Sequence, residues 1–98
     1  MDTLKEIRDK HSLSIKQVAD LLKLTSGTVT TYCSVDSDNA GKYAVELESI
    51  INNAYDVAAE FDNPGVKEMP IKQLAKKVIM MNFRLGTEAY RVFQILGS

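Results

Sequence analysis

Residues 13–32, which read LSIKQVADLLKLTSGTVTTY, decide the predicted fold. Apolar side chains recur three or four residues apart before and after Lys23 and Leu24, a spacing typical of helices that bury one face. Ser14 and Thr25 are residue types that favour the N-cap position of a helix, and each stands just before one of the two apolar patterns. We therefore predict helices over residues 15–22 and 25–33, joined by a tight turn.

The apolar positions of this stretch also indicate how the two helices cross. Ala19 falls where the backbones would approach closely, and Leu24 would fill the corner between the helices. Val29 and Tyr32 would hold the second helix against the rest of the chain. This spacing is typical of a helix-turn-helix, whose second helix can enter the major groove of DNA, about 12 Å wide.

The rest of the chain also predicts an all-α fold, because no segment shows sustained alternation of apolar and polar residues. We expect further helices over residues 3–11, 42–61 and 70–82 and a last one from Thr87, with a loop over residues 34–41 (SVDSDNAG). Pro64 and Gly65 end the long helix. We divide the chain into a helix-turn-helix domain, 1–62, and a helical oligomerisation segment, 63–98, because segments 78–83 and 90–96 are more apolar than a terminal hairpin needs.

Composition limits the possible classes of protein. A chain of 98 residues with 45% apolar side chains is a single small globular protein. The net charge of −1 excludes a polycation that coats nucleic acid, although the middle of the chain is acidic and the last third basic. The first ten residues, MDTLKEIRDK, do not form an apolar leader, and no apolar run is long enough to cross a membrane. The single cysteine cannot form an internal disulfide. We therefore expect a cytoplasmic protein without a membrane partner.

The helix-turn-helix stretch resembles a known family. Its signature residues are Arg8, Leu13, Ser14, Val18, Ala19, Leu22, Leu24, Thr25, Thr28, Val29 and Tyr32. They resemble the lambda-repressor-like superfamily, which includes the phage repressors and the Cro proteins; the fragment VADLLKLTSGTVT is also similar to the headpiece of the lac repressor group. This resemblance implies specific binding of double-stranded DNA by a symmetric dimer.

Two positions depart from the family pattern. Lys23 stands where the family usually has glycine, so it needs either a left-handed backbone or a slightly different turn. Ile15 stands where many members have a glutamine that contacts a phosphate, so that contact is not expected here.

The same resemblance implies the residues that contact DNA. Family members read base edges from the positions of Ser26, Gly27, Thr28, Thr30 and Thr31, and Thr25 caps the same helix. Lys16 and Gln17, with the hydroxyls of Thr25 and Thr28 and the first amides of the helix, are candidates for phosphate contacts, and Lys23 is a further one. Short hydroxyls can pair with several bases, so we expect modest discrimination per contact.

The sequence contains few residues of the types that form catalytic or metal sites. One histidine, His11, and one cysteine, Cys33, do not make a metal site or a nucleophilic triad, so we expect neither an enzyme nor a cofactor. Cys33 is either a half-buried structural residue or a redox sensor. Lys72, Lys76 and Lys77 could bind phosphates, pair with the acidic helix over 42–61, or form a solvated face.

The sequence thus predicts a transcriptional regulator, a repressor of phage or mobile-element type, that reads a palindromic operator as a homodimer or higher homo-oligomer. One alternative is a DNA-binding antitoxin that also binds a toxin partner. Another is a phage DNA-packaging or replication protein that binds a start site, and a third is a module that binds only protein.

Overall fold

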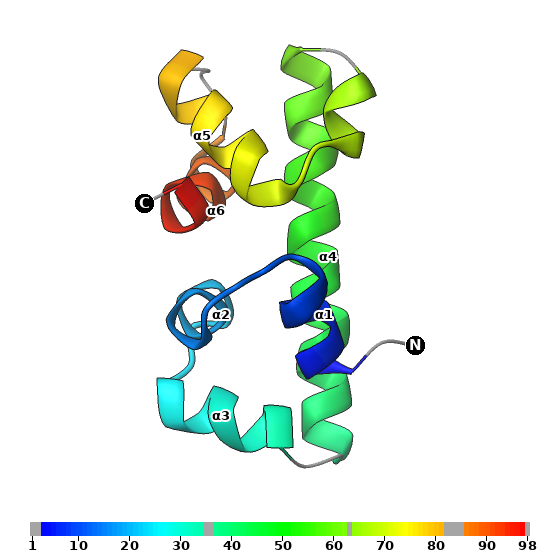
Figure 1. The fold of residues 1–98 in the computed structure, drawn as a ribbon, viewed down its shortest axis with the longest axis vertical. Helices are drawn as coiled ribbons and strands as arrows, with labels where there is room; N and C mark the ends of the chain where they lie inside the picture. Colours follow the sequence, from blue (N-terminus) through cyan, green and yellow to red (C-terminus); the bar gives the residue numbers. More distant parts are fainter. Residues whose placement is uncertain (1–2, 35–36, 63, 82–85, 98) are drawn as a thin grey trace. The chain divides into compact units, whose positions relative to one another are not determined.

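The computed structural model describes residues 3–34, 37–62, 64–81 and 86–97 (Figure 1). Within these ranges all regular structure is helical, with α1 to α6 and one short 3-10 helix, so the predicted all-α class is confirmed. The chain divides into two compact units, residues 1–49 and 50–98. The dividing point lies inside the long helix α4 (Asp38–Phe61), and the predicted functional boundary at residue 62 stays a prediction.

Three short helices open the first unit: α1 (Leu4–Lys10), α2 (Ile15–Leu22) and α3 (Ser26–Ser34). The bounds of α2 are those predicted, and those of α1 and α3 differ from the prediction by one residue at each end. Reciprocal hydrogen bonds between Thr3 and Glu6 cap α1, and the same arrangement between Ser14 and Gln17 caps α2. Such capping boxes satisfy amides that the first turn of a helix leaves without partners, which explains why both helices begin where they do.

The core of the first unit is built from one face of each helix. Figure 1 shows α3 crossing beneath α2, and α3 also contacts α1. Of the positions predicted to face inward, Val18, Ala19, Leu22 and Val29 are buried, whereas Ile15, Leu24 and Tyr32 are half-buried. Further core side chains of this unit are Leu4, Ile7, Leu13, Leu21, Ala40, Ala44 and Leu47.

The helix α4 begins earlier than the sequence predicts. Residues 38–41 were expected in a loop, but they form the first turn of α4; residues 35 and 36 lie outside the described ranges. Ser37 caps this turn, because its Oγ accepts from the N–H of Ala40 at 3.2 Å and its carbonyl accepts from the N–H of Gly41 at 3.0 Å. Ser, Asp and Asn are common both in loops and in the first turn of helices, so their presence did not distinguish the two.

The second unit contains the end of α4, the 3-10 helix η1 (Pro64–Glu68), α5 (Ile71–Met81) and α6 (Thr87–Gly97). The predicted end of α5 at Asn82 lies outside the described residues. α5 packs against α6. A Cβ at Gly97 would lie 2.6 Å from Ile79 Cδ1 and 3.4 Å from the backbone of Ala75, so a larger residue would require the Ile79 side chain to shift. The core side chains are Ile51, Ala54, Ala58, Val66, Ile71, Leu74, Ala75, Val78, Ala89, Val92, Phe93 and Leu96.

Polar contacts join the segment from η1 to α5 to the last part of α4 and to Asp62, which follows α4. The Tyr55 hydroxyl donates to the Met69 carbonyl at 2.6 Å. Lys67 pairs with Asp56 at 2.8 Å, and Lys77 pairs with Asp62. One interpretation left open for the basic segment was pairing with the acidic helix over 42–61. The observed partner of Lys77, Asp62, follows the end of that helix rather than lying on it. No helix among the described residues has the length and apolar character needed to span a bilayer.

Candidate nucleic-acid interface

Residues 23–25 form the turn between α2 and α3. Lys23 has φ 59° and ψ 42°, which is the left-handed conformation, the first of the two outcomes expected at this position. The N–H groups of Lys23 and Leu24 both donate to the Ala19 carbonyl, the latter at 2.9 Å, and close the last turn of α2. The start of α3 is therefore fixed relative to α2 by backbone geometry.

Replacing Lys23 by glycine is expected to raise the free energy of unfolding by about 1 kcal/mol, because glycine adopts the left-handed conformation without the steric cost of a Cβ. Ser12, with φ 56°, should respond in the same way. As a control, glycine at the exposed Lys42 of α4 should lower the free energy of unfolding by about 1 kcal/mol. Chemical denaturation measures all three, and a destabilised Lys23→Gly variant would contradict the left-handed turn.

Two side chains fix the orientation of α3. Val29 is fully buried, and Tyr32 is half-buried and stacks on Tyr43 of α4, with ring centroids 5.4 Å apart. The opposite face carries the exposed residues Ser26, Gly27, Thr30, Thr31 and Ser34. The residues predicted to read base edges from the middle of the helix therefore lie together on the surface.

The hydroxyls at the start of α3 bond to each other. Thr25 Oγ1 accepts from the N–H of Thr28 at 3.2 Å, which makes Thr25 the N-cap that the sequence predicted. The two hydroxyl oxygens lie 2.8 Å apart, so one of them donates to the other. One hydroxyl proton of the pair is left for a further acceptor, and Thr25 is exposed whereas Thr28 is half-buried.

The hydroxyls farther along α3 bond to its own backbone. Thr30 Oγ1 donates to the Ser26 carbonyl at 2.9 Å, and Thr31 Oγ1 donates to the Gly27 carbonyl at 3.0 Å. Ser34 Oγ donates to the Thr30 carbonyl at 3.0 Å. Such bonds to the carbonyl four residues earlier are a known alternative for Ser and Thr in helices, and they fix the side-chain rotamers on the exposed face.

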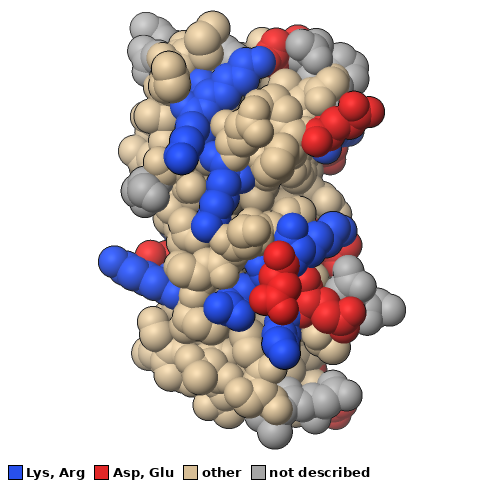
Figure 2. All heavy atoms as spheres, in the orientation of Figure 1, with Lys and Arg blue, Asp and Glu red and all other residues tan. Residues whose placement is uncertain are grey.

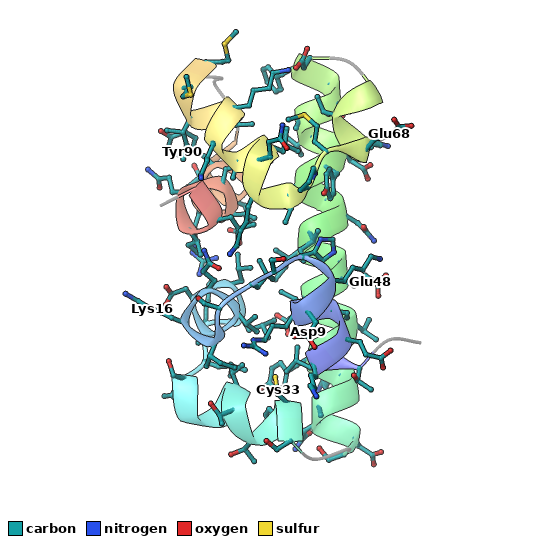
Figure 3. The ribbon with its side chains drawn as sticks, viewed as in Figure 1. Asp9, Lys16, Cys33, Glu48, Glu68 and Tyr90 are labelled. Carbon is teal, nitrogen blue, oxygen red and sulfur yellow. The ribbon has the colours of Figure 1, made fainter. Side chains whose placement is uncertain are left out.

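The two candidates from α2 differ in what they can offer a phosphate. Figure 3 shows Lys16 projecting away from α2, and its side chain is exposed. Gln17 is half-buried, and its Oε1 accepts from the N–H of Ser14 at 2.9 Å. The amide NH₂ of Gln17 is the group that suits a phosphate oxygen, because phosphates accept hydrogen bonds.

The surface over α3 carries no formal charge of its own. The α3 sequence, SGTVTTYCS, has no ionisable residue other than Tyr32 and Cys33, and Figure 2 shows an area without Lys or Arg where α3 lies. Basic side chains in this unit come from other segments: Lys5, Arg8, Lys10, Lys16, Lys23 and Lys42. The charged side chains available to the phosphate backbone therefore lie beside α3 rather than on it.

Cys33 points from α3 toward α1 (Figure 3) and is half-buried. Burial raises the pKa of its thiol; Arg8 and Lys5 oppose that shift, and Asp9 adds to it. A thiol with a raised pKa is a weak nucleophile, so the structure favours the structural reading over the redox sensor. Sequence reasoning missed the influence of Arg8 on this thiol, because α1 and α3 come together only in the folded chain.

His11 is the C-cap of α1, where its backbone N–H donates to the Ile7 carbonyl at 3.2 Å. Its imidazole is half-buried, and burial lowers its pKa; Lys10 lowers it further, while Glu48 opposes the shift. Among the residues that the structure describes, no group of three His, Cys, Asp or Glu side chains could hold a metal ion.

Comparison with known proteins finds a similarity to a curated protein. No protein-family model and no solved structure matches the chain. The chain is similar to a protein of Pyrococcus abyssi (strain GE5 / Orsay) whose name provisionally describes it as an HTH-type transcriptional regulatory protein. The two are 27% identical over 94 residues, which cover 91% of this chain and 30% of the relative. The chain thus spans less than a third of the relative's length, and the similarity extends into both units.

Proposed function

We propose that the chain is a DNA-binding transcriptional regulator that recognises specific double-stranded sequences through α3. The observation that carries this proposal is the tight α2–α3 turn, which leaves Ser26, Gly27, Thr30 and Thr31 exposed on a helix that Val29 anchors. The name of the Pyrococcus abyssi relative supports a helix-turn-helix regulator. The proposal assigns no catalytic role and no cofactor to the chain, and it implies a cytoplasmic location.

The contacts divide into two kinds. Phosphates would be held by Lys16, the amide of Gln17, the Thr25–Thr28 hydroxyl pair and the first amides of α3, since the N-terminus of a helix attracts anions. Base edges would be read from Thr30 and Thr31. Gly27 would let the α3 backbone come close to the DNA, because a Cβ at this position would meet no protein atom within 4 Å.

We further propose a regulator of the lambda-repressor-like type that binds as a dimer and represses by blocking RNA polymerase, as in phages and mobile elements. The second unit supports self-association, because large apolar side chains at the end of α5 are exposed: Met80 by 84%, Met81 by 61% and Ile79 by 37%. Contiguous exposed apolar surface is typical of protein contact sites, and these three residues follow one another in the chain. A two-fold dimer would place its α3 helices about 34 Å apart on DNA.

Selection of bound sequences from a random duplex library, at a stated salt concentration, tests the proposal. We expect enrichment of a palindrome with half-sites about 10 base pairs apart, bound at least about a thousand-fold more tightly than random duplex. Enrichment of a single half-site would contradict the dimer. Equal binding of all duplexes would contradict a sequence-specific regulator.

The exposed methionines also favour a second candidate, a DNA-binding antitoxin. Methionine is a flexible side chain that adapts to varied protein partners, so Met80 and Met81 could cover a toxin instead of a second copy. Light scattering on the purified chain separates the two. A dimer at micromolar concentration supports the repressor; a monomer supports the antitoxin, and a closed ring supports the packaging protein.

A further inference from the structure

Thr30 and Thr31 can offer only part of what a hydroxyl normally offers to a base. Each side chain is exposed, and each donates its one proton to a backbone carbonyl, Ser26 at 2.9 Å and Gly27 at 3.0 Å. A hydroxyl has one proton and two acceptor lone pairs. The exposed oxygens of both residues are therefore acceptors, and each carries a methyl group beside it.

We infer that Thr30 and Thr31 select A·T base pairs by accepting from the adenine N6 amino group and by packing their methyls on the thymine methyl. This inference rests on the proposed function. In the major groove guanine presents only acceptors, N7 and O6, which an acceptor oxygen cannot satisfy. Cytosine presents a donor, N4, but a G·C pair has no methyl, so only an A·T pair matches both parts of the side chain.

Among residues 27–34 no other exposed side chain provides the missing donors. The α3 sequence SGTVTTYCS has no Arg, Lys, Asn or Gln, the side chains that pair twice with guanine or adenine. Ser34, one turn after Thr30 and Thr31, also donates its proton to a backbone carbonyl, that of Thr30. The free proton of the Thr25–Thr28 pair lies at the first turn, where phosphates are expected.

The backbone bonds also have a reason to persist when DNA binds. Both hydroxyl bonds are made to carbonyls of α3 itself, so they need no partner that DNA binding would remove. If the hydroxyl of either threonine rotated to donate to guanine, its hydrogen bond to the backbone carbonyl of Ser26 or Gly27 would be lost. Recognition of adenine keeps both bonds.

Two double variants separate the oxygen from the methyl. Thr30→Val with Thr31→Val removes the acceptor oxygens and keeps branched apolar side chains. Thr30→Ser with Thr31→Ser keeps the oxygens and removes the methyls. The probes start from a duplex selected by the whole chain. In a first set of copies, a single adenine is replaced by purine, which lacks the 6-amino group. In a second set, a single thymine is replaced by uracil, which lacks the methyl group.

For the natural chain, we expect the purine substitution and the uracil substitution with the largest effects each to weaken binding about three- to ten-fold. This factor corresponds to the loss of one hydrogen bond or one methyl contact. The valine variant should lose its response to purine and keep its response to uracil. The serine variant should do the reverse. Each protein is compared with itself on the selected and the substituted duplex, so changes in protein stability cancel. Comparing these responses among the three proteins then cancels the effect of each substitution on the duplex itself.

The outcomes distinguish this inference from the function on which it rests. If selection enriches no sequence, both fail. Selection could instead enrich G·C pairs at the positions where the Thr30 and Thr31 variants change the affinity. The proposed regulator would then stand, and the inference would be overturned. It is also overturned if A·T pairs are enriched but the variants respond to both analogues as the natural chain does, because the preference would then come from DNA shape.

Discussion

Replacing Thr30 and Thr31 together by alanine is expected to weaken binding to the selected duplex roughly 10- to 100-fold, because both proposed base contacts are lost. Binding to random duplex should change little, since that binding depends on phosphate contacts made elsewhere. Both side chains are exposed, so the loss would not arise from unfolding. Fluorescence anisotropy on the two duplexes measures the ratio.

The matched control is the pair Ser49→Ala and Asn53→Ala, two exposed residues one turn apart on α4. It should leave both affinities unchanged. If the Thr30 and Thr31 variant kept the full affinity for the selected duplex, α3 would not be the recognition helix.

Gly27→Ala is expected to stabilise the protein and to weaken its binding to DNA. Gly27 lies within α3, and a Cβ there would meet nothing within 4 Å, so alanine should raise the free energy of unfolding by about 0.5–1 kcal/mol. The same methyl would stand between the α3 backbone and the DNA. We expect a loss of affinity of about ten-fold, corresponding to about 1.4 kcal/mol.

Gly41→Ala separates these effects, because Gly41 lies in α4 and its Cβ would also meet nothing within 4 Å. It should give the same gain in stability without a change in DNA affinity. Thermal and chemical denaturation measure the first quantity and anisotropy the second. An unchanged affinity in Gly27→Ala would show that the α3 backbone does not approach the DNA at this point.

Local signals explain what the sequence predicted well. Ser14 and Thr25 cap α2 and α3 in the structure because an N-cap needs only a side-chain oxygen and the amides of the next turn. Lys23 is left-handed, one of the two outcomes expected, because it stands at the turn position that is usually glycine in the family that this stretch resembles. Such features depend on a few neighbouring residues.

Features that depend on contacts between segments, or on a choice between two local options, were not predictable. The segment 38–41 could be a loop or a first helical turn, and its cap at Ser37 decided the matter. Thr30 and Thr31 bond to the backbone because each adopts one of the two side-chain rotamers that a threonine can take in a helix. The ion pairs of Lys67 and Lys77 join residues far apart in the chain.

Amide hydrogen exchange with and without the selected duplex tests most directly whether α3 is the surface that binds DNA. The account predicts slower exchange over residues 25–34 and at the first turn of α2 when DNA is bound, because those amides become covered or bound to phosphate. Exchange in the middle of α4 should change little. Slowing confined to α5 and α6, with α3 unchanged, would contradict the account.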